Sequence, residues 1–237
     1  MAPSLTEHLT SLRTARPYAA ATQHPFLHAA GTGTLPASTL SLYIAQDRRY
    51  AAHAYPRFLG QLLARVPFDT AVNAPRDPAE RLAGVLFDAL AAVRDEVRLF
   101  DALAGGRIPP LGRWPERRAT RAYAAEMARV AACGSLEDGL VFLWAMERVY
   151  LDSWKYVKSL HSTEVQGTSV IAPVVAELAD HWTSPEFEQF VEILEGLVND
   201  CGITPVMAAF RRAEEIWARV IELETDFWPD VTEGDLN

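Results

Sequence analysis

The sequence predicts an all-α protein, a single-domain multi-helix bundle. Apolar residues recur at helical spacing along most of the chain, and strand-like alternation of β-branched and polar residues is weak. Proline or glycine interrupts the helical pattern at intervals. No linker, repeat or change in composition marks a boundary within the 237 residues. We therefore expect one domain over residues 1–237, with its core at about 5–230 and an acidic tail at 229–237.

The first part of the chain predicts two helices separated by a loop. Ser4 is a suitable cap for a helix that extends to about residue 20. A loop rich in turn residues follows at 24–36. The next helix is expected over 38–64, and Pro56 should kink it or divide it in two.

The middle of the chain predicts three helices. Prolines at 75–78 begin a helix that extends to about residue 104 and ends at two glycines. After a proline-rich loop, a helix is expected over 116–132. Ser135 and Asp138 have the spacing of a capping box and begin a helix that reaches about residue 160.

The last part of the chain predicts three further helices after a loop at 162–169. The first has about ten residues and breaks near 181–185, and the second covers 186–200. Thr204 and Pro205 are expected to cap the final helix, with proline at its first position. The tail from Pro229 is expected to be frayed.

The composition limits the classes of partner. Hydrophobic residues make up 49% of the chain and the formal net charge is −9. A sizeable core is expected, and neither a nucleic acid nor an anionic membrane suits this charge. No apolar run is long enough to span a membrane, and no charged-then-apolar leader is present. We expect a cytoplasmic protein with a small-molecule ligand.

We expect neither a metal nor an organic cofactor. Histidine is sparse, no HxxxH with an intervening glutamate occurs, and GxSxG, Walker A and GxGxxG motifs are absent. His24 and His28 flank a loop and are interpreted as part of a structural turn, with a proximal haem ligand as the alternative. Cys133 and Cys201 form no CxxC pair, so a reduced intracellular setting is favoured over a disulfide between them.

Glu224 is the most informative residue, because it interrupts an apolar stripe on the last helical segment. The residues of this stripe follow helical spacing and are Val206, Phe210, Ala213, Trp217, Ile221, Glu224 and Trp228. A carboxylate among apolar side chains is costly to bury unless it is paired or protonated. Glu224 is therefore a candidate pocket residue, unless the helix is rotated so that Glu222 points inward. Trp217 and Trp228 are interpreted as core residues.

Two other carboxylates have similar surroundings. Asp47 lies on a helical face with Tyr43, Tyr50 and Ala54. The alternative for Asp47 is a surface salt bridge with the neighbouring arginines at 48 and 49.

Glu147 shares a helical face with Tyr150 and Trp154, and Tyr150 is a candidate binding residue. The alternative for Glu147 is a solvated charge beside Arg148. Carboxylates on inward faces from both ends of the chain favour one pocket lined by helices.

On these residues the chain resembles the TenA/thiaminase-II family, a branch of the haem-oxygenase-like fold. The matching runs are HPF at 24–26, GTLP at 33–36, YIAQDRRY at 43–50, Tyr123 followed by WAMERVY at 144–150, and ETDFW at 224–228. Their order and spacing match from about residue 5 to 230. The resemblance implies the TenA architecture and a homo-oligomer, either a dimer or a tetramer.

The resemblance also implies roles for single residues. Asp47 would bind an aminopyrimidine ring, and Tyr50 would form an aromatic wall. Tyr123 would line the pocket, and Glu224 would be the catalytic glutamate. Trp182 lies where many members have a tyrosine.

The chain departs from the family at its nucleophile. Where many members have a cysteine, this sequence has Ala145 or Met146, and neither side chain can attack a carbon. Cys133 lies about three helical turns upstream and is a poor substitute. The chain thus resembles the subgroup without the cysteine, in which Glu147 would contribute acid–base chemistry.

The resemblance implies a hydrolase of thiamin-derived aminopyrimidines in thiamin salvage. Without the cysteine, water would attack aminomethyl- or formylaminomethyl-pyrimidine directly, with acid–base help from the glutamates. The alternative is a non-catalytic ligand-binding or regulatory protein on the same fold.

Overall fold

The structure is a computed structural model that describes residues 3–67, 78–164 and 170–235. Over these ranges its regular elements are helices, and no strand occurs, so the all-α prediction is confirmed. The α-helices are α1 (Leu5–Ser11), α2 (Tyr18–Thr22), α3 (Pro25–Gly31), α4 (Ala37–Arg49), α5 (Tyr55–Leu63), α6 (Pro78–Ala104), α7 (Arg118–Cys133), α8 (Leu136–Glu164), α9 (Ala172–Trp182), α10 (Pro185–Asp200) and α11 (Ala208–Phe227).

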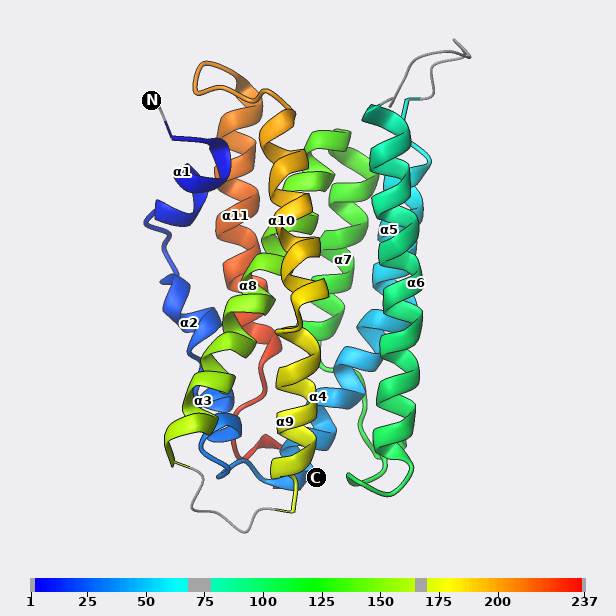
Figure 1. Cartoon of the computed structure of the whole chain (residues 1–237), viewed down its shortest axis with the longest axis vertical. Coiled ribbons are helices and arrows are strands. Elements are labelled where there is room, and N and C mark those ends of the chain that lie inside the picture. Colours follow the sequence, from blue (N-terminus) through cyan, green and yellow to red (C-terminus); the bar gives the residue numbers. More distant parts are fainter. Residues whose placement is uncertain (1–2, 68–77, 165–169, 236–237) are drawn as a thin grey trace.

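The long helices run roughly parallel to the long axis of a bundle (Figure 1). Helices α1, α2 and α3 run down one flank, and α5 and α6 form the opposite flank. Helix α8 contacts α11, α10, α3 and α9, which places it in the middle of the packing. A single large cluster of buried apolar side chains joins these helices to α4, α6 and α7.

The first predicted helix is two helices, so the expectation of one element over 4–20 is wrong. Ser4 does cap α1, and it forms a capping box with Glu7. The chain leaves the helix at Leu12 and becomes helical again only after Pro17, which is the N-cap of α2. Proline disfavours helical backbone in the residue before it, so the helix cannot pass through Arg16 without a break.

The predicted division of the helix over 38–64 is confirmed. Helix α4 ends at Arg49, a π-helical segment η1 covers Tyr50–Ala54, and α5 then begins with Pro56 in its first turn. Proline has no N–H to donate to the preceding turn, and a wider π turn accommodates this loss.

The middle helices lie close to their predicted bounds. Residues 75–77 lie outside the described ranges, and α6 ends before Gly105. The capping box at the start of α8 is confirmed, because Ser135 and Asp138 exchange backbone-to-side-chain hydrogen bonds of 3.0 and 3.2 Å. Helix α8 continues to Glu164, so residues 162–164 are helical and not part of the predicted loop; residues 165–169 lie outside the described ranges.

The predicted start of the final helix is wrong. Thr204 accepts a hydrogen bond from the N–H of Met207 at 2.9 Å, which closes a turn, and α11 begins at Ala208. Met207 has extended backbone, so Pro205 cannot be the first residue of the helix. The apolar stripe is therefore shorter than predicted, and Val206 is 93% exposed.

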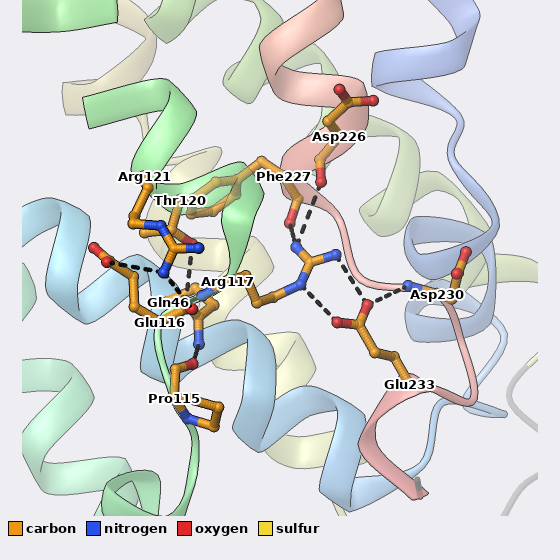
Figure 2. Close-up of polar contacts among 10 residues, drawn as sticks. All are labelled: Gln46, Pro115, Glu116, Arg117, Thr120, Arg121, Asp226, Phe227, Asp230 and Glu233. Carbon is orange, nitrogen blue, oxygen red and sulfur yellow. Dashed lines mark hydrogen bonds and ion pairs between the residues drawn. The ribbon is translucent and has the colours of Figure 1, made fainter. Parts of the chain in front are cut away.

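The acidic tail is docked and not frayed, which corrects the prediction for the residues described up to 235. The Arg117 guanidinium donates hydrogen bonds of 2.8 and 2.9 Å to the two carboxylate oxygens of Glu233 and one of 2.6 Å to the carbonyl of Phe227 (Figure 2). Gly234 lies against the backbone of Thr39 so closely that an added Cβ would be 2.4 Å from its nitrogen. Ion pairing and close backbone contact therefore hold a segment that composition alone marks as polar.

Candidate functional site

A cavity of about 280 Å³ lies among α4, α6, α7, α8, α11 and the α9–α10 junction. The candidate residues that line it are Asp47, Tyr50, Tyr123, Glu147, Tyr150, Trp182 and Glu224. Seven residues that are far apart in the sequence therefore share one cavity. Exposed lining residues such as Ala92, Asp95 and Glu186 come from α6 and the start of α10, so the cavity opens to solvent between these helices.

Asp47 lies at the end of α4 and points into the cavity, with 5% of its surface exposed. One of its oxygens accepts hydrogen bonds from the hydroxyls of Tyr43 at 2.8 Å and Tyr150 at 2.7 Å. These two hydroxyls also contact each other. Burial raises the pKa of Asp47, and the tyrosine hydrogen bonds oppose this rise.

The neighbouring arginines do not neutralise Asp47. Arg48 donates to Asp101 at 2.6 Å, on the outer side of the bundle. Arg49 donates to the backbone carbonyls of Ala45 and Trp114. The surface salt bridge considered for Asp47 does not form, and Asp47 is a cavity residue.

Glu224 is 3% exposed, which places it at the inner end of the cavity wall. The hydroxyl of Tyr123 on α7 donates a hydrogen bond of 2.5 Å to one of its oxygens. Burial raises the pKa of Glu224 to about 8; the Tyr123 bond lowers it, and the carboxylates of Asp47 and Glu147 raise it further. Glu222, the alternative inward residue, instead pairs with Arg219 at 3.0 Å.

Glu147 on α8 is 9% exposed and accepts a hydrogen bond from the hydroxyl of Tyr55. Burial raises its pKa to about 7, the Tyr55 bond opposes this, and Asp47 adds to it. Arg148 pairs with Asp152 at 3.0 Å and leaves Glu147 without a cation. The solvated reading of Glu147 is therefore wrong. Tyr55 was not foreseen, because the π segment before it breaks the helical register.

Glu96 is a further carboxylate of the cavity, and it was not predicted from the sequence. It lies on α6 and accepts a hydrogen bond of 2.7 Å from the indole N–H of Trp182. Burial raises its pKa well above the usual range, and the charges of Asp47 and Glu147 act in the same direction.

The signal for Glu96 was present in the sequence. It interrupts an apolar stripe on α6 just as Glu224 interrupts one on α11. The buried residues of that stripe are Leu86, Ala89, Val93, Phe100 and Leu103.

Aromatic rings form the walls between these carboxylates. The ring of Tyr50 lies 5.2 Å from that of Tyr123 and 5.8 Å from that of Tyr55. The rings of Tyr150 and Trp182 meet edge to face at 5.1 Å. This arrangement provides ring faces and edges for an aromatic ligand.

Trp217 and Trp228 belong to the core, as expected. Trp217 stacks on Trp144 with ring centres 5.2 Å apart, and Trp228 stacks on Phe26 at 5.6 Å. Neither lines the cavity.

No cysteine lines the cavity within the described part of the chain. Met146 occupies the wall near Glu147, and its sulfur accepts a hydrogen bond of 3.2 Å from Tyr50. Cys133 is exposed at the end of α7, Cys201 is half-buried, and both are free thiols. The alternative of a disulfide between them is not realised.

The histidines considered for haem have structural contacts. His24 accepts a hydrogen bond from the N–H of Phe26 at 3.2 Å, which caps α3 and supports the interpretation as a turn. The ring of His28 is 3.0 Å from the hydroxyl of Tyr156. Among the described side chains, no group of three or more His, Cys, Asp and Glu is placed to hold a metal ion. No helix in the described ranges is long and apolar enough to cross a membrane.

Comparison with known proteins supports the TenA fold. The chain superposes on the TenA homologue from Pyrococcus furiosus with a TM-score of 0.74 and 21% identity, over 89% of this chain and 92% of that one. It is 21% identical to "Probable bifunctional TENA-E protein" from Glycine max, over 89% of this chain and 86% of that protein.

A third relative has a different name and a greater length. The chain is 23% identical to "Probable transcription factor" from Fusarium pseudograminearum over 260 residues, which is 97% of this chain and 51% of that protein. The chain thus spans about half the length of this relative. No protein-family model matches the chain. At these identities the comparisons confirm the TenA architecture. That the chain resembles the subgroup without the cysteine stays a prediction.

Proposed function

We propose that the protein hydrolyses a thiamin-derived aminopyrimidine that carries an aminomethyl or formylaminomethyl group. The observation that carries this proposal is the convergence of Asp47, Glu147 and Glu224 on one cavity with aromatic walls. The resemblance to TenA and thiaminase-II proteins supplies the substrate class. The volume of about 280 Å³ suits a single substituted ring.

Ligand binding would use a carboxylate oxygen of Asp47 that has no hydrogen bond within the described residues. One oxygen of Asp47 accepts two tyrosine hydrogen bonds, and the other has no hydrogen bond within the described residues. It can therefore accept a hydrogen bond from the amino group or a protonated nitrogen of the ring. The rings of Tyr50, Tyr123 and Trp182 would contact the pyrimidine by stacking or by their edges.

The chemistry would divide acid and base roles between two carboxyl groups. With pKa values raised to about 7 and about 8, Glu147 and Glu224 can exist near neutral pH as one ionised and one protonated group. Ionised Glu147 would take a proton from water while the water oxygen bonds to the exocyclic carbon. As the carbon–nitrogen bond breaks, Glu224 would give its proton to an uncharged leaving nitrogen, such as that of the formylaminomethyl group, whereas an aminomethyl group that is already an ammonium ion would leave as ammonia.

This route requires no covalent intermediate. Met146 lines the described cavity wall next to Glu147, the proposed base, and its thioether cannot act as the nucleophile. Water held between the two glutamates would replace the cysteine as the attacking group. General acid–base catalysis of this kind contributes roughly 10²–10⁴-fold to rate.

The test is hydrolysis of aminomethyl- and formylaminomethyl-pyrimidine by the wild type, Glu224→Gln and Glu222→Gln. Glu222 lies on the same helix but pairs with Arg219 outside the cavity, so it controls for the change of charge. We expect turnover by the wild type and by Glu222→Gln, and a loss of roughly 10²-fold or more in Glu224→Gln. Equal rates in all three proteins would remove Glu224 from the mechanism. Absence of turnover by the wild type would refute the hydrolase.

The second candidate function is ligand binding or regulation without catalysis. Two observations favour it: no cysteine lines the described cavity, and one relative is named a transcription factor. Calorimetric titration with the same pyrimidines separates the two functions, since binding without turnover would identify the non-enzyme. A cytoplasmic location and a homo-oligomer, dimeric or tetrameric, stay predictions from the sequence.

A further inference from the structure

We propose that Glu96 is a specificity-determining residue, through which the cavity selects positively charged aromatic ligands over neutral ligands of the same shape. For pyrimidines this inference rests on the proposed function. On that basis the cavity would prefer the aminomethyl-pyrimidine, because an aminomethyl group is protonated at neutral pH and a formylaminomethyl group is not.

The fold holds Glu96 by one oxygen and leaves the other free. Oε1 accepts the 2.7 Å hydrogen bond from Trp182, while Oε2 has no hydrogen bond within the described residues. Glu96 lines the cavity beside Asp47, and its partial exposure places it toward the opening. A ligand that passes this point therefore meets a carboxylate whose orientation is fixed and whose second oxygen is available.

The same arrangement recurs deeper in the cavity. Asp47, Glu147 and Glu224 each accept hydrogen bonds on one oxygen from tyrosine hydroxyls and have none on the other within the described ranges. These three side chains are 5%, 9% and 3% exposed. Buried carboxyl oxygens that face a cavity without a partner point to a ligand that supplies hydrogen-bonding groups.

No lysine or arginine lines the cavity among the described residues. His181 is its single described basic residue, and burial lowers the pKa of His181, so the ring is neutral at pH 7. At the opening, Asp95 is already paired with Arg98 at 2.6 Å. Two carboxylates near the opening therefore have no ion pair among the described residues and no part in the proposed acid–base chemistry, the exposed Glu186 and the less exposed Glu96. Of these two, Glu96 is the one whose orientation is fixed, by its hydrogen bond from Trp182.

The basic side chains of this region lie in a second cavity of about 330 Å³, lined by Arg49, His53 and Arg57. Tyr50 lines both cavities. The second cavity is also lined by one carboxylate, Glu116, so it is mixed in charge, whereas the first has several carboxylates and contains the candidate catalytic residues.

A cation that binds beside Glu96 would displace the proton of a carboxyl group. Without ligand, burial and the neighbouring carboxylates favour the protonated form of Glu96. An ammonium ion at hydrogen-bonding distance favours the ionised form. Binding of a cation is therefore coupled to proton release, and binding of a neutral ligand is not.

The experiment compares two pairs of ligands that differ in charge. The first pair is the aminomethyl-pyrimidine and its hydroxymethyl counterpart, and the second is benzylammonium and benzyl alcohol. Affinities are measured by calorimetry for the full chain, for Glu96→Gln and for Asp88→Asn. Asp88 is an exposed residue of α6, so its substitution removes the same charge from the same helix outside the cavity.

We expect the wild type and Asp88→Asn to bind the cation of each pair at least about 10-fold more tightly than its neutral counterpart. Glu96→Gln keeps an oxygen acceptor for Trp182. It should lose most of this preference, because its affinity for the cation alone should fall. An equal loss of affinity for both ligands of a pair, or no change in either affinity, would overturn the proposal, because Glu96 would then only shape the cavity.

A measurement on the wild type alone covers the case in which Glu96→Gln does not fold. Titration in buffers of different ionisation enthalpy should show release of a substantial fraction of a proton with benzylammonium and none with benzyl alcohol. Equal proton release with both ligands would overturn the proposal.

The two proposals fail in different ways. Hydrolysis of both pyrimidine substrates without a preference for charge would reject the role of Glu96 and keep the hydrolase. Charge-selective binding of benzylammonium without any pyrimidine binding would keep the selectivity and reject the hydrolase. If none of the four ligands binds, both proposals are wrong.

Discussion

Two regions of this protein hold acidic side chains in opposite ways. In the cavity, Asp47, Glu147 and Glu224 are buried with tyrosine hydroxyls as their partners and without a cation. In the clamp formed by Arg117 and Glu233, a guanidinium binds both carboxylate oxygens and a backbone carbonyl (Figure 2). The clamp uses charge to fasten the chain, whereas the cavity keeps its carboxyl groups available to a ligand.

Burial alone does not distinguish the two kinds of acid. Asp138 is 6% exposed, close to the 5% of Asp47, yet it pairs with Arg212 at 3.0 Å and caps α8. What differs is the partner. A buried carboxylate with a cation serves the fold, and a buried carboxyl group without one has a raised pKa and an open acceptor, which are properties of reactive sites.

The two regions meet at the end of α11. The ring of Phe227 lines the cavity, and its carbonyl accepts a hydrogen bond from Arg117 in the clamp. Glu224 lies one helical turn before it. The clamp therefore anchors the helix end that presents the candidate catalytic glutamate.

The largest expected effect is on catalysis by the cavity. Glu147→Gln keeps an acceptor for Tyr55 but cannot take a proton from water, so we expect kcat to fall by roughly 10²-fold or more. The measurement is turnover of aminomethyl-pyrimidine, together with thermal unfolding to show that the fold is intact. Turnover near the wild-type rate in a folded Glu147→Gln protein would assign the base elsewhere.

The second effect is a dependence of stability on pH that arises in the cavity. Burial raises the pKa of Glu224 from its usual 4.5 to about 8 in the folded protein, so the folded state binds more protons between these values. Stability should therefore fall as pH rises from about 5 to 8, and Glu147 should act in the same direction. Glu224→Gln removes this cost and should be more stable than the wild type at pH 8 by on the order of 4 kcal/mol.

At pH 4 the wild type and Glu224→Gln should have nearly equal stability, because the carboxyl group is then protonated in the folded state and mostly protonated in the unfolded state. Chemical denaturation at both pH values measures the difference. A Glu224→Gln protein that is less stable than the wild type at pH 8 would show that Glu224 stabilises the fold, as the acids of the clamp do.

The third effect has the opposite sign and belongs to the clamp. Arg117→Met leaves the Glu233 carboxylate and the Phe227 carbonyl without their donor and should destabilise the protein by about 1–3 kcal/mol. Arg16→Met is the control, because the Arg16–Asp226 pair is 42% and 57% exposed and should contribute little. Equal small effects of both substitutions would show that the clamp does not fasten the tail.

The smallest effect concerns the paired acid of α8. Asp138→Asn should cost about 1 kcal/mol, since it weakens the capping box with Ser135 and the ion pair with Arg212. Ligand binding in the cavity should not change. Thermal unfolding measures the stability and calorimetric titration measures the ligand affinity. A change in ligand affinity would show that a structural acid also affects the cavity.

Helical periodicity was sufficient for much of this structure. The stripes that contain Glu224 and Asp47 correctly predicted their burial, because a residue's face on a helix is set by its neighbours three and four positions away. The same rule would have found Glu96 on α6. The end of α1 at Leu12 and the late start of α11 after Met207 were not predicted. Backbone conformation near a proline can interrupt a helix while the apolar pattern continues.

The sequence by itself determined the helical class, most of the helix bounds and the inward faces of the acidic residues, since these depend on local spacing. Only the tertiary structure decided which carboxyl groups share a cavity and which receive a cation. Arg48 and Arg148 adjoin cavity acids in the sequence but bind Asp101 and Asp152 outside it. Arg117 reaches Glu233 across 116 positions of the chain. The Arg148–Asp152 pair has the i,i+4 spacing of one helix, which the sequence does show, whereas Arg48 and Arg117 find their partners through the packing of segments that are distant in the chain.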